Sequence, residues 1–242
     1  MLYIIDMDKS LKEEQLIILK ALAGKIDDFY LVGGTALSLF YCDHRESEDL
    51  DFFTKSFSSG RVMQIVTDLE KQLGVEIKPL ADNLAESNPF KVMIYTAKMP
   101  NYQIKIDFVQ DALKLLLPLE VRDGINVLSV DDIYLKKTYA VSGFPTGIDE
   151  IGRLTFNGGR QSAKDLFDLY YLSKNHLNLS KFVARYCDQA RREGIIRWWN
   201  SFDRMEMKLE LSEVKTKENI EFIYIDKHID NEIKIMLREE IS

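Results

Sequence analysis

The chain reads Leu31-Val32-Gly33-Gly34-Thr35 and, shortly afterwards, Asp49-Leu50-Asp51-Phe52-Phe53. The first stretch predicts a buried strand over residues 29–32, a glycine turn, and a helix over residues 36–41. Two glycines let the backbone turn sharply and approach a ligand closely, and the first N–H groups of a helix attract phosphate. Gly33, Gly34 and Thr35 are therefore candidates for binding the phosphates of a nucleotide.

Three acids are candidate metal ligands. Asp49 and Asp51 are two positions apart in or beside a strand predicted over residues 50–54, so both carboxylates project from the same face. Asp107 is a lone acid in an apolar strand predicted over residues 102–109. If the two strands are neighbours, three carboxylates converge, and carboxylate oxygens are preferred ligands of Mg²⁺. We therefore predict that Asp49, Asp51 and Asp107 bind Mg²⁺.

Three acids around Mg²⁺ beside a phosphate-binding turn are what nucleotidyl transfer requires. The metal neutralises the triphosphate, lowers the pKa of the attacking hydroxyl and stabilises the pyrophosphate leaving group. Asp107 would also accept the proton of that hydroxyl. Each motif has a structural alternative when taken alone, because Gly-Gly-Thr is often only a turn and Asp-x-Asp on a strand often faces solvent.

These motifs resemble the DNA polymerase beta-type nucleotidyltransferase fold. Together with Arg45 and Ser47, the stretches 31–37 and 49–53 more closely resemble the AbiEii/AbiGii toxin family of nucleotidyltransferases. This resemblance implies that Arg45 and Ser47 help to bind the nucleotide by shaping the loop before the acids. The alternative for these two residues is a solvated turn.

The resemblance extends downstream to two further motifs. They are Asp132-Ile133-Tyr134-Leu135-Lys136-Lys137 and Lys164-Asp165-Leu166-Phe167-Asp168-Leu169. The resemblance implies that Lys137, or alternatively Lys136, contacts the triphosphate and that Asp165 is a further functional acid. In the structural alternative, Ser162 and Asp165 cap a helix, and Lys164 and Asp168 form a surface pair at i,i+4 spacing.

The resemblance also implies a biological role and partners. The protein would use a nucleoside triphosphate to modify an acceptor such as the end of a tRNA, or a protein. It would act as the toxin of a type IV toxin–antitoxin or phage-defence system with a separately encoded antitoxin. A non-catalytic nucleotide-binding regulatory protein on the same fold and a metal-dependent phosphohydrolase are the alternatives.

Composition sets further limits. The chain has 242 residues, of which 46% are hydrophobic and 29% charged, which excludes a disordered or fibrous protein. A net charge of −7 argues against nonspecific coating of nucleic acid. An arginine-rich stretch around Trp198 and Trp199 is either a local nucleic-acid patch or, as we favour, a solvated helix face. The stretch comprises Arg185, Arg191, Arg192, Arg197 and Arg204.

The few cysteines and histidines, and the lack of a long apolar run, limit the other chemistries and the cellular location that we expect. Cys42 and Cys187 are too few for a disulfide framework and are expected to be reduced. The three histidines, His44, His176 and His228, are interpreted as structural. A long apolar run and a leader are both lacking, so we expect a cytoplasmic protein without a membrane segment.

The expected fold is α+β, a nucleotidyltransferase-like mixed sheet flanked by helices and followed by a mainly helical half. The expected domains are a nucleotidyltransferase core over residues 1–129 and a mainly helical region over residues 130–242 that packs on the core. Residues 143–159 form either a functional loop or a small hairpin. Residues 210–226 have an alternating, strand-like character. Further strands are expected over 75–79 and 90–98, and helices over 9–26, 61–73, 131–141, 162–173, 180–193 and 227–239.

Overall fold

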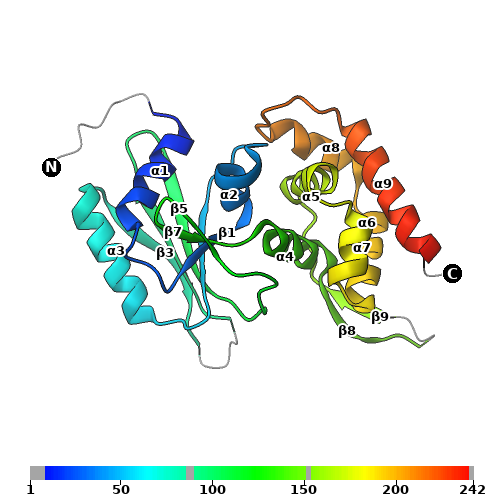
Figure 1. The fold of residues 1–242 in the computed structure, drawn as a ribbon, viewed down its shortest axis with the longest axis horizontal. Coiled ribbons are helices and arrows are strands. Elements are labelled where there is room, and N and C mark those ends of the chain that lie inside the picture. The colour runs from blue at the N-terminus through cyan, green and yellow to red at the C-terminus, as the bar shows by residue number, and fades with distance from the viewer. Residues whose placement is uncertain (1–8, 86–89, 151–153, 240–242) are drawn as a thin grey trace. The chain divides into compact units, whose positions relative to one another are not determined.

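The computed structural model describes residues 9–85, 90–150 and 154–239 (Figure 1). The chain forms two compact units that divide between Asp132 and Ile133. In the described residues the first unit is a mixed sheet with helices, and the second is mostly helical. The expected fold class, a mixed sheet followed by a mainly helical half, is confirmed.

The first unit contains, in its described residues, a seven-stranded sheet of order β3-β4-β5-β2-β1-β7-β6. β1 runs antiparallel to β2 and parallel to β7, and β2 runs parallel to β5. The remaining neighbours are antiparallel. The strands are β1 (Tyr30–Val32), β2 (Leu50–Thr54), β3 (Ile77–Asn83), β4 (Val92–Lys98), β5 (Gln103–Gln110), β6 (Glu120–Arg122) and β7 (Ile125–Val127).

Alternation along the central strands separates a core face from a more open face. On β5, Ile104, Ile106 and Phe108 are fully buried, whereas Lys105 and Asp107 on the other face are partly exposed. The Phe108 ring stacks on Phe52 of β2 with 5.7 Å between ring centroids. This burial fixes the register of β2 against β5, because a slip of one residue would place the charged face in the core.

Side chains cap two helices of the first unit at their N-termini. α1 (Leu11–Leu22) begins with a complete capping box between Ser10 and Glu13. α3 (Ser59–Leu73) is capped by Ser58, whose side chain accepts a hydrogen bond from the backbone N–H of Arg61. Between them, α2 (Gly33–Leu37) continues into the π-helix η1 (Ser38–Cys42), which covers the helix expected after the glycine pair.

The second unit differs from expectation in its details. The Gly-rich stretch 143–159 contains the hairpin of β8 (Phe144–Ile148) and β9 (Leu154–Asn157). The single helix expected over 180–193 is wrong, because Asp188 caps a new helix by accepting from the backbone of Arg191. The strand-like stretch 210–226 instead includes the end of one helix and the start of another. The helices are α4 (Val130–Ser142), α5 (Ala163–Asn175), α6 (Leu179–Tyr186), α7 (Gln189–Ser201), α8 (Arg204–Glu213) and α9 (Phe222–Glu239).

The arginine-rich stretch does not form an exposed stacking surface. Trp198 and Trp199 are 2% and 1% exposed and belong to the core of the second unit. Arg191 is also buried and donates to the Ser142 hydroxyl and the Gly143 carbonyl. A base could not stack on these tryptophans in this arrangement, so the nucleic-acid interpretation of this stretch is not supported. Among the described residues, no helix is both long and apolar enough to cross a membrane.

Candidate active site

Two neighbouring strands bring the predicted acids together. In the parallel pair of β2 and β5, Asp51 lies directly opposite Asp107. Asp49 immediately precedes β2 and falls on the same face as Asp51, because side chains alternate along a strand. The three acids predicted to bind a metal therefore lie on one face of the sheet in the first unit.

A lysine that the sequence analysis did not single out lies among these acids. Lys105 Nζ is 3.2 Å from Asp49 Oδ2 and 3.1 Å from Asp107 Oδ2. Its side chain is 34% exposed, against 13% for Asp107. The sequence signal was available, because Lys105 is two positions before Asp107 on the same strand and must therefore share its face.

Burial and the charge of the partner shift the pKa values of Asp107 and Lys105 in opposite directions. Burial raises the pKa of Asp107, and nearby Asp49 raises it further, while the hydrogen bond and charge of Lys105 lower it; the net direction is upward. Burial disfavours the charged form of Lys105, but the hydrogen bonds and negative charges of Asp107 and Asp49 outweigh this and raise its pKa. The Lys105 ammonium is thus stabilised by the acids around it.

The residues present suit a hard cation in their chemistry. Asp107 Oδ1 is shielded from solvent and has no hydrogen-bond partner within residues 9–85, 90–150 and 154–239. A buried carboxylate oxygen without a partner is costly, and a cation would satisfy it. In the described residues, however, no three His, Cys, Asp or Glu side chains are grouped closely enough to hold a metal as they stand. The acids fit a divalent cation by type, and their side chains must move to share one.

The glycine pair is needed for contacts with the chain's own side chains. A Cβ atom at Gly33, whose φ is +76°, would overlap Asp51 Oδ2. A Cβ atom at Gly34 would lie 2.5 Å from Arg45 Nη2 and 2.8 Å from Ser47 Oγ. The predicted nucleotide-binding turn and the predicted metal ligands are therefore in direct contact within the first unit.

The other predicted nucleotide-binding residues form a braced loop beside this turn. Thr35 is fully buried, and its hydroxyl donates a hydrogen bond to the backbone carbonyl of Asp49. Arg45 is buried and donates to the Glu46 carbonyl at 2.8 Å, so the solvated-turn alternative is wrong for this residue. The Ser47 carbonyl accepts from Gln15 Nε2 at 2.7 Å. These contacts fix the loop that leads into Asp49.

The downstream motifs meet in a buried ionic network of the second unit. Lys137 Nζ lies 2.7 Å from Asp165 Oδ1 and 2.6 Å from Asp168 Oδ2. Arg160 adds a second cation at Asp165, with its Nε 3.0 Å from Oδ2. Lys137, Asp165 and Asp168 are all buried. Lys137 rather than Lys136 therefore joins the two acidic positions of the later motif, and Asp168 is not part of a surface pair.

The capping alternative for Asp165 is only partly met. Ser162 occupies the N-cap position of α5, but its side chain makes no capping hydrogen bond to the described residues. The backbone N–H of Ala163 is instead satisfied by Glu210 Oε2 at 3.0 Å. Asp165 lies in the first turn of α5, where an acid is favourable, yet its carboxylate is directed to Lys137 and Arg160.

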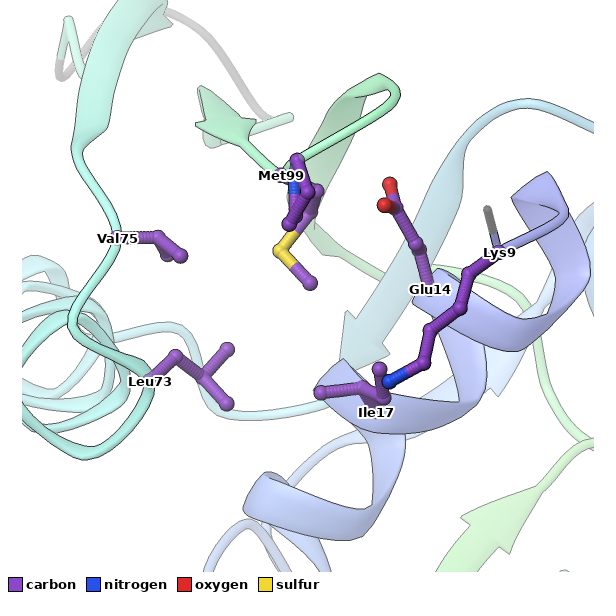
Figure 2. Close-up of a pocket in the computed structure, with 7 residues that line it drawn as sticks. Lys9, Glu14, Ile17, Leu73, Val75 and Met99 are labelled. Atoms are coloured by element: carbon purple, nitrogen blue, oxygen red, sulfur yellow. The ribbon is translucent and has the colours of Figure 1, made fainter. Parts of the chain in front are cut away.

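A small pocket elsewhere in the first unit does not contribute to this site (Figure 2). Its volume is about 30 Å³. The Glu14 carboxylate beside it already accepts hydrogen bonds from the backbone N–H groups of Asn101 and Tyr102 at 2.9 and 3.1 Å. The pocket is lined by Lys9, Glu14, Ile17, Leu73, Val75, Met99 and Pro100, a set that shares no residue with the predicted site.

The model of one protein family matches most of the chain. The model of a family described as "AbiEii: Nucleotidyl transferase AbiEii toxin, Type IV TA system" matches residues 17–238. An uncharacterized protein of Aquifex aeolicus (strain VF5), aq_aa25, is 29% identical over 175 residues, which are 69% of each chain.

Solved structures share the fold. JHP933 from Helicobacter pylori has a TM-score of 0.55 and 18% identity, with 96% of this chain and 95% of that chain covered. MenT4, the nucleotidyltransferase toxin Rv2826c from Mycobacterium tuberculosis H37Rv, has a TM-score of 0.51 and 13% identity. That match covers 94% of this chain and 82% of MenT4.

Proposed function

Because this chain belongs to the AbiEii family of nucleotidyl transferase toxins, we propose that it transfers a nucleoside monophosphate from a nucleoside triphosphate to an acceptor hydroxyl with the help of Mg²⁺. The observation that carries this proposal is the pairing of Asp51 with Asp107 across β2 and β5, beside the Gly33-Gly34 turn. This arrangement puts candidate metal ligands next to a candidate phosphate-binding turn.

Asp49, Asp51 and Asp107 would hold the cation. When bound, a divalent cation supplies positive charge that neutralises the triphosphate and lowers the pKa of a bound hydroxyl. The Asp107 carboxylate would also accept the proton of the acceptor hydroxyl. The hydroxyl oxygen then forms a bond to the α-phosphorus, the bond from that phosphorus to the bridging oxygen breaks, and pyrophosphate leaves.

We assign the nucleotide to the glycine turn and the loop braced against it. Gly33, Gly34 and Thr35 would face the phosphates, and Arg45 and Ser47 would support this loop. The buried guanidinium of Arg45 lies against Gly34, which keeps a positive charge close to the turn. A positive charge at this position favours an anionic ligand.

Lys137 and Asp165 have proposed roles that depend on their shared network. Lys137 would contact the triphosphate, and Asp165 would hold the Lys137 ammonium in place, as the 2.7 Å contact between them supports. Asp168 would position the same ammonium from its other side. Phosphate oxygens would then compete with these two carboxylates for the lysine.

The partners follow from the family and remain proposals for this chain. The acceptor would be an RNA such as tRNA, or a protein, and the reaction would take place in the cytoplasm without a membrane. The family supports a toxin with a cognate antitoxin, and we propose a type IV toxin–antitoxin or phage-defence system. The net charge of −7 requires an RNA acceptor to use a local basic surface.

Label transfer tests this function. Each of the α-³²P-labelled nucleoside triphosphates is incubated with Mg²⁺ and the protein, with either total RNA or protein as acceptor. Label that appears with the wild type and disappears with Asp51→Asn supports the proposal and identifies nucleotide and acceptor class. Asp82→Asn, at an exposed position on edge strand β3, is the matched control and should retain transfer. Nucleotide binding without transfer to any acceptor would favour the regulatory alternative.

A further inference from the structure

Lys105 occupies the space that the proposed metal site requires. The parallel register of β2 and β5 places Asp51 opposite Asp107, and Lys105 lies two residues before Asp107 on the same face. The Lys105 side chain therefore lies alongside the start of β2, where Asp49 is found. Its ammonium contacts Asp49 Oδ2 at 3.2 Å and Asp107 Oδ2 at 3.1 Å.

The Asp107 carboxylate that Lys105 contacts is mostly buried. The side chain of Asp107 is only 13% exposed, so its charge needs a nearby cation. Lys105 meets this need at Oδ2, while Oδ1 is left shielded from solvent and without a partner in the described residues. Lys105 thus compensates part of the negative charge of the acids and does not satisfy all of it.

A divalent cation and the Lys105 ammonium would compete for the carboxylates of Asp49 and Asp107. A cation held by Asp49 and Asp107 would draw on the carboxylates that Lys105 now contacts. Two positive charges so close repel each other strongly in a partly buried site.

We propose that Lys105 is a built-in counter-ion of Asp49 and Asp107, and that a divalent cation must displace it from these two carboxylates. Lys105 is a positioning residue, because it acts through the two carboxylates. Once displaced, its flexible stem leaves the ammonium free to face an anionic ligand. This inference rests on the proposed function, since it concerns the same acids.

Binding of Mn²⁺ to the nucleotide-free protein tests this inference without any turnover. The loss of the electron paramagnetic resonance signal of free Mn²⁺ reports the Kd. We expect Lys105→Met to bind Mn²⁺ about tenfold more tightly than the wild type, because one like charge in direct contact is removed. Lys105→Gln, a second neutral variant, should behave in the same way, whereas Lys105→Arg keeps the charge and should stay near the wild type.

Lys78→Met is the matched control for loss of one positive charge. Lys78 lies in the same row of the sheet, since it pairs with Thr96 of β4 and Thr96 pairs with Lys105. It is two strands away and pairs with exposed Glu76. Its removal should change the Kd by less than about twofold, because charges at this separation are largely screened.

The outcomes separate this inference from the proposed function. Unchanged or weaker Mn²⁺ binding in both neutral variants overturns the role of Lys105, even if label transfer is intact. Mn²⁺ binding that survives Asp107→Asn undiminished also overturns it, because the ion is then bound elsewhere. Tighter binding in the neutral variants together with no label transfer by the wild type supports Lys105 as counter-ion and contradicts the transferase proposal instead.

Discussion

The carboxylate of Asp51 lies against the backbone of Gly33, in the space that the Cβ atom of any other residue would occupy. Gly33 also has a φ of +76°, a conformation that residues with a Cβ atom rarely adopt. The glycine is therefore needed for two reasons, one conformational and one steric. This contact ties the predicted phosphate-binding turn to the predicted metal ligands.

Replacing Gly33 should consequently affect activity as well as stability. Gly33→Ala is expected to lower the free energy of unfolding by about 1–2 kcal/mol through backbone strain, and to push Asp51 out of position. Label transfer should fall to the level of Asp51→Asn. Urea unfolding and the transfer assay measure the two effects separately.

Gly74 provides the control for the backbone strain that a Cβ atom causes at positive φ. It caps α3 with a φ of +67°, and apart from its two chain neighbours no described residue comes within 4 Å of a Cβ atom built there. Gly74→Ala should cost a similar amount of stability and leave transfer unchanged. Equal transfer by Gly33→Ala and Gly74→Ala would show that the Asp51 contact is unimportant.

A second prediction concerns the buried ammonium of the second unit. Lys137→Met leaves Asp165 and Asp168 buried without the cation that they share. Removing one partner from a buried ionic network is expected to lower the free energy of unfolding by about 3–5 kcal/mol. Chemical denaturation of the purified variant measures this loss.

Lys136→Met is the neighbouring control, because Lys136 is partly exposed on the same helix. It should lower stability by less than about 1 kcal/mol. A Lys137→Met variant as stable as the wild type would mean that the network has no structural role and that any loss of transfer comes from chemistry alone.

The third prediction is a pH dependence of stability that arises from His228. Burial lowers the pKa of His228, Glu232 opposes this shift and Lys174 adds to it. The unfolded chain therefore takes up this proton at a higher pH than the folded chain. The stability that comes from neutral His228 is present above its unfolded pKa of about 6.5 and is lost as the pH falls through the lower folded value.

His228→Gln should accordingly weaken the fall in stability between about pH 7.5 and about pH 5.5. The glutamine can keep a hydrogen bond to the Ser173 hydroxyl, which lies 2.8 Å from His228 Nε2. His176→Gln, at the exposed end of α5, should leave the wild-type pH dependence in place. Urea unfolding midpoints at both pH values measure this change in stability. An equal fall for the wild type and His228→Gln would rule out His228 as the source of the pH dependence.

Much of the first unit could be predicted from local patterns. β2 spans the predicted residues 50–54, and the alternation of Ile104, Ile106 and Phe108 in the sequence matches the buried face of β5. The acids followed from the same rule, because a period of two puts Asp49 and Asp51 on one face. The β6–β7 hairpin was missed, since strands of three residues are too short to show a periodic pattern.

Other features were not predicted, one of them set by a local cap and the rest by long-range contacts. The turn after α6 is set by Asp188 capping α7, and the apolar spacing runs on across it without a break. The pairing of Lys137 with Asp168 joins residues from two helices, and local spacing suggested a surface pair for Asp168 instead. Lys105 is intermediate, because its face was predictable but its position between two acids required the register of β2 against β5.

The position of the transferred phosphorus tests the central claim, nucleotidyl transfer, most directly. The protein is incubated with Mg²⁺, acceptor and the same nucleoside triphosphate labelled with ³²P at either the α or the γ position. Transfer of a nucleoside monophosphate predicts label on the acceptor from the α position only, with the γ label released in pyrophosphate. Label on the acceptor from the γ position, or release of the γ label as orthophosphate with an unlabelled acceptor, would contradict nucleotidyl transfer.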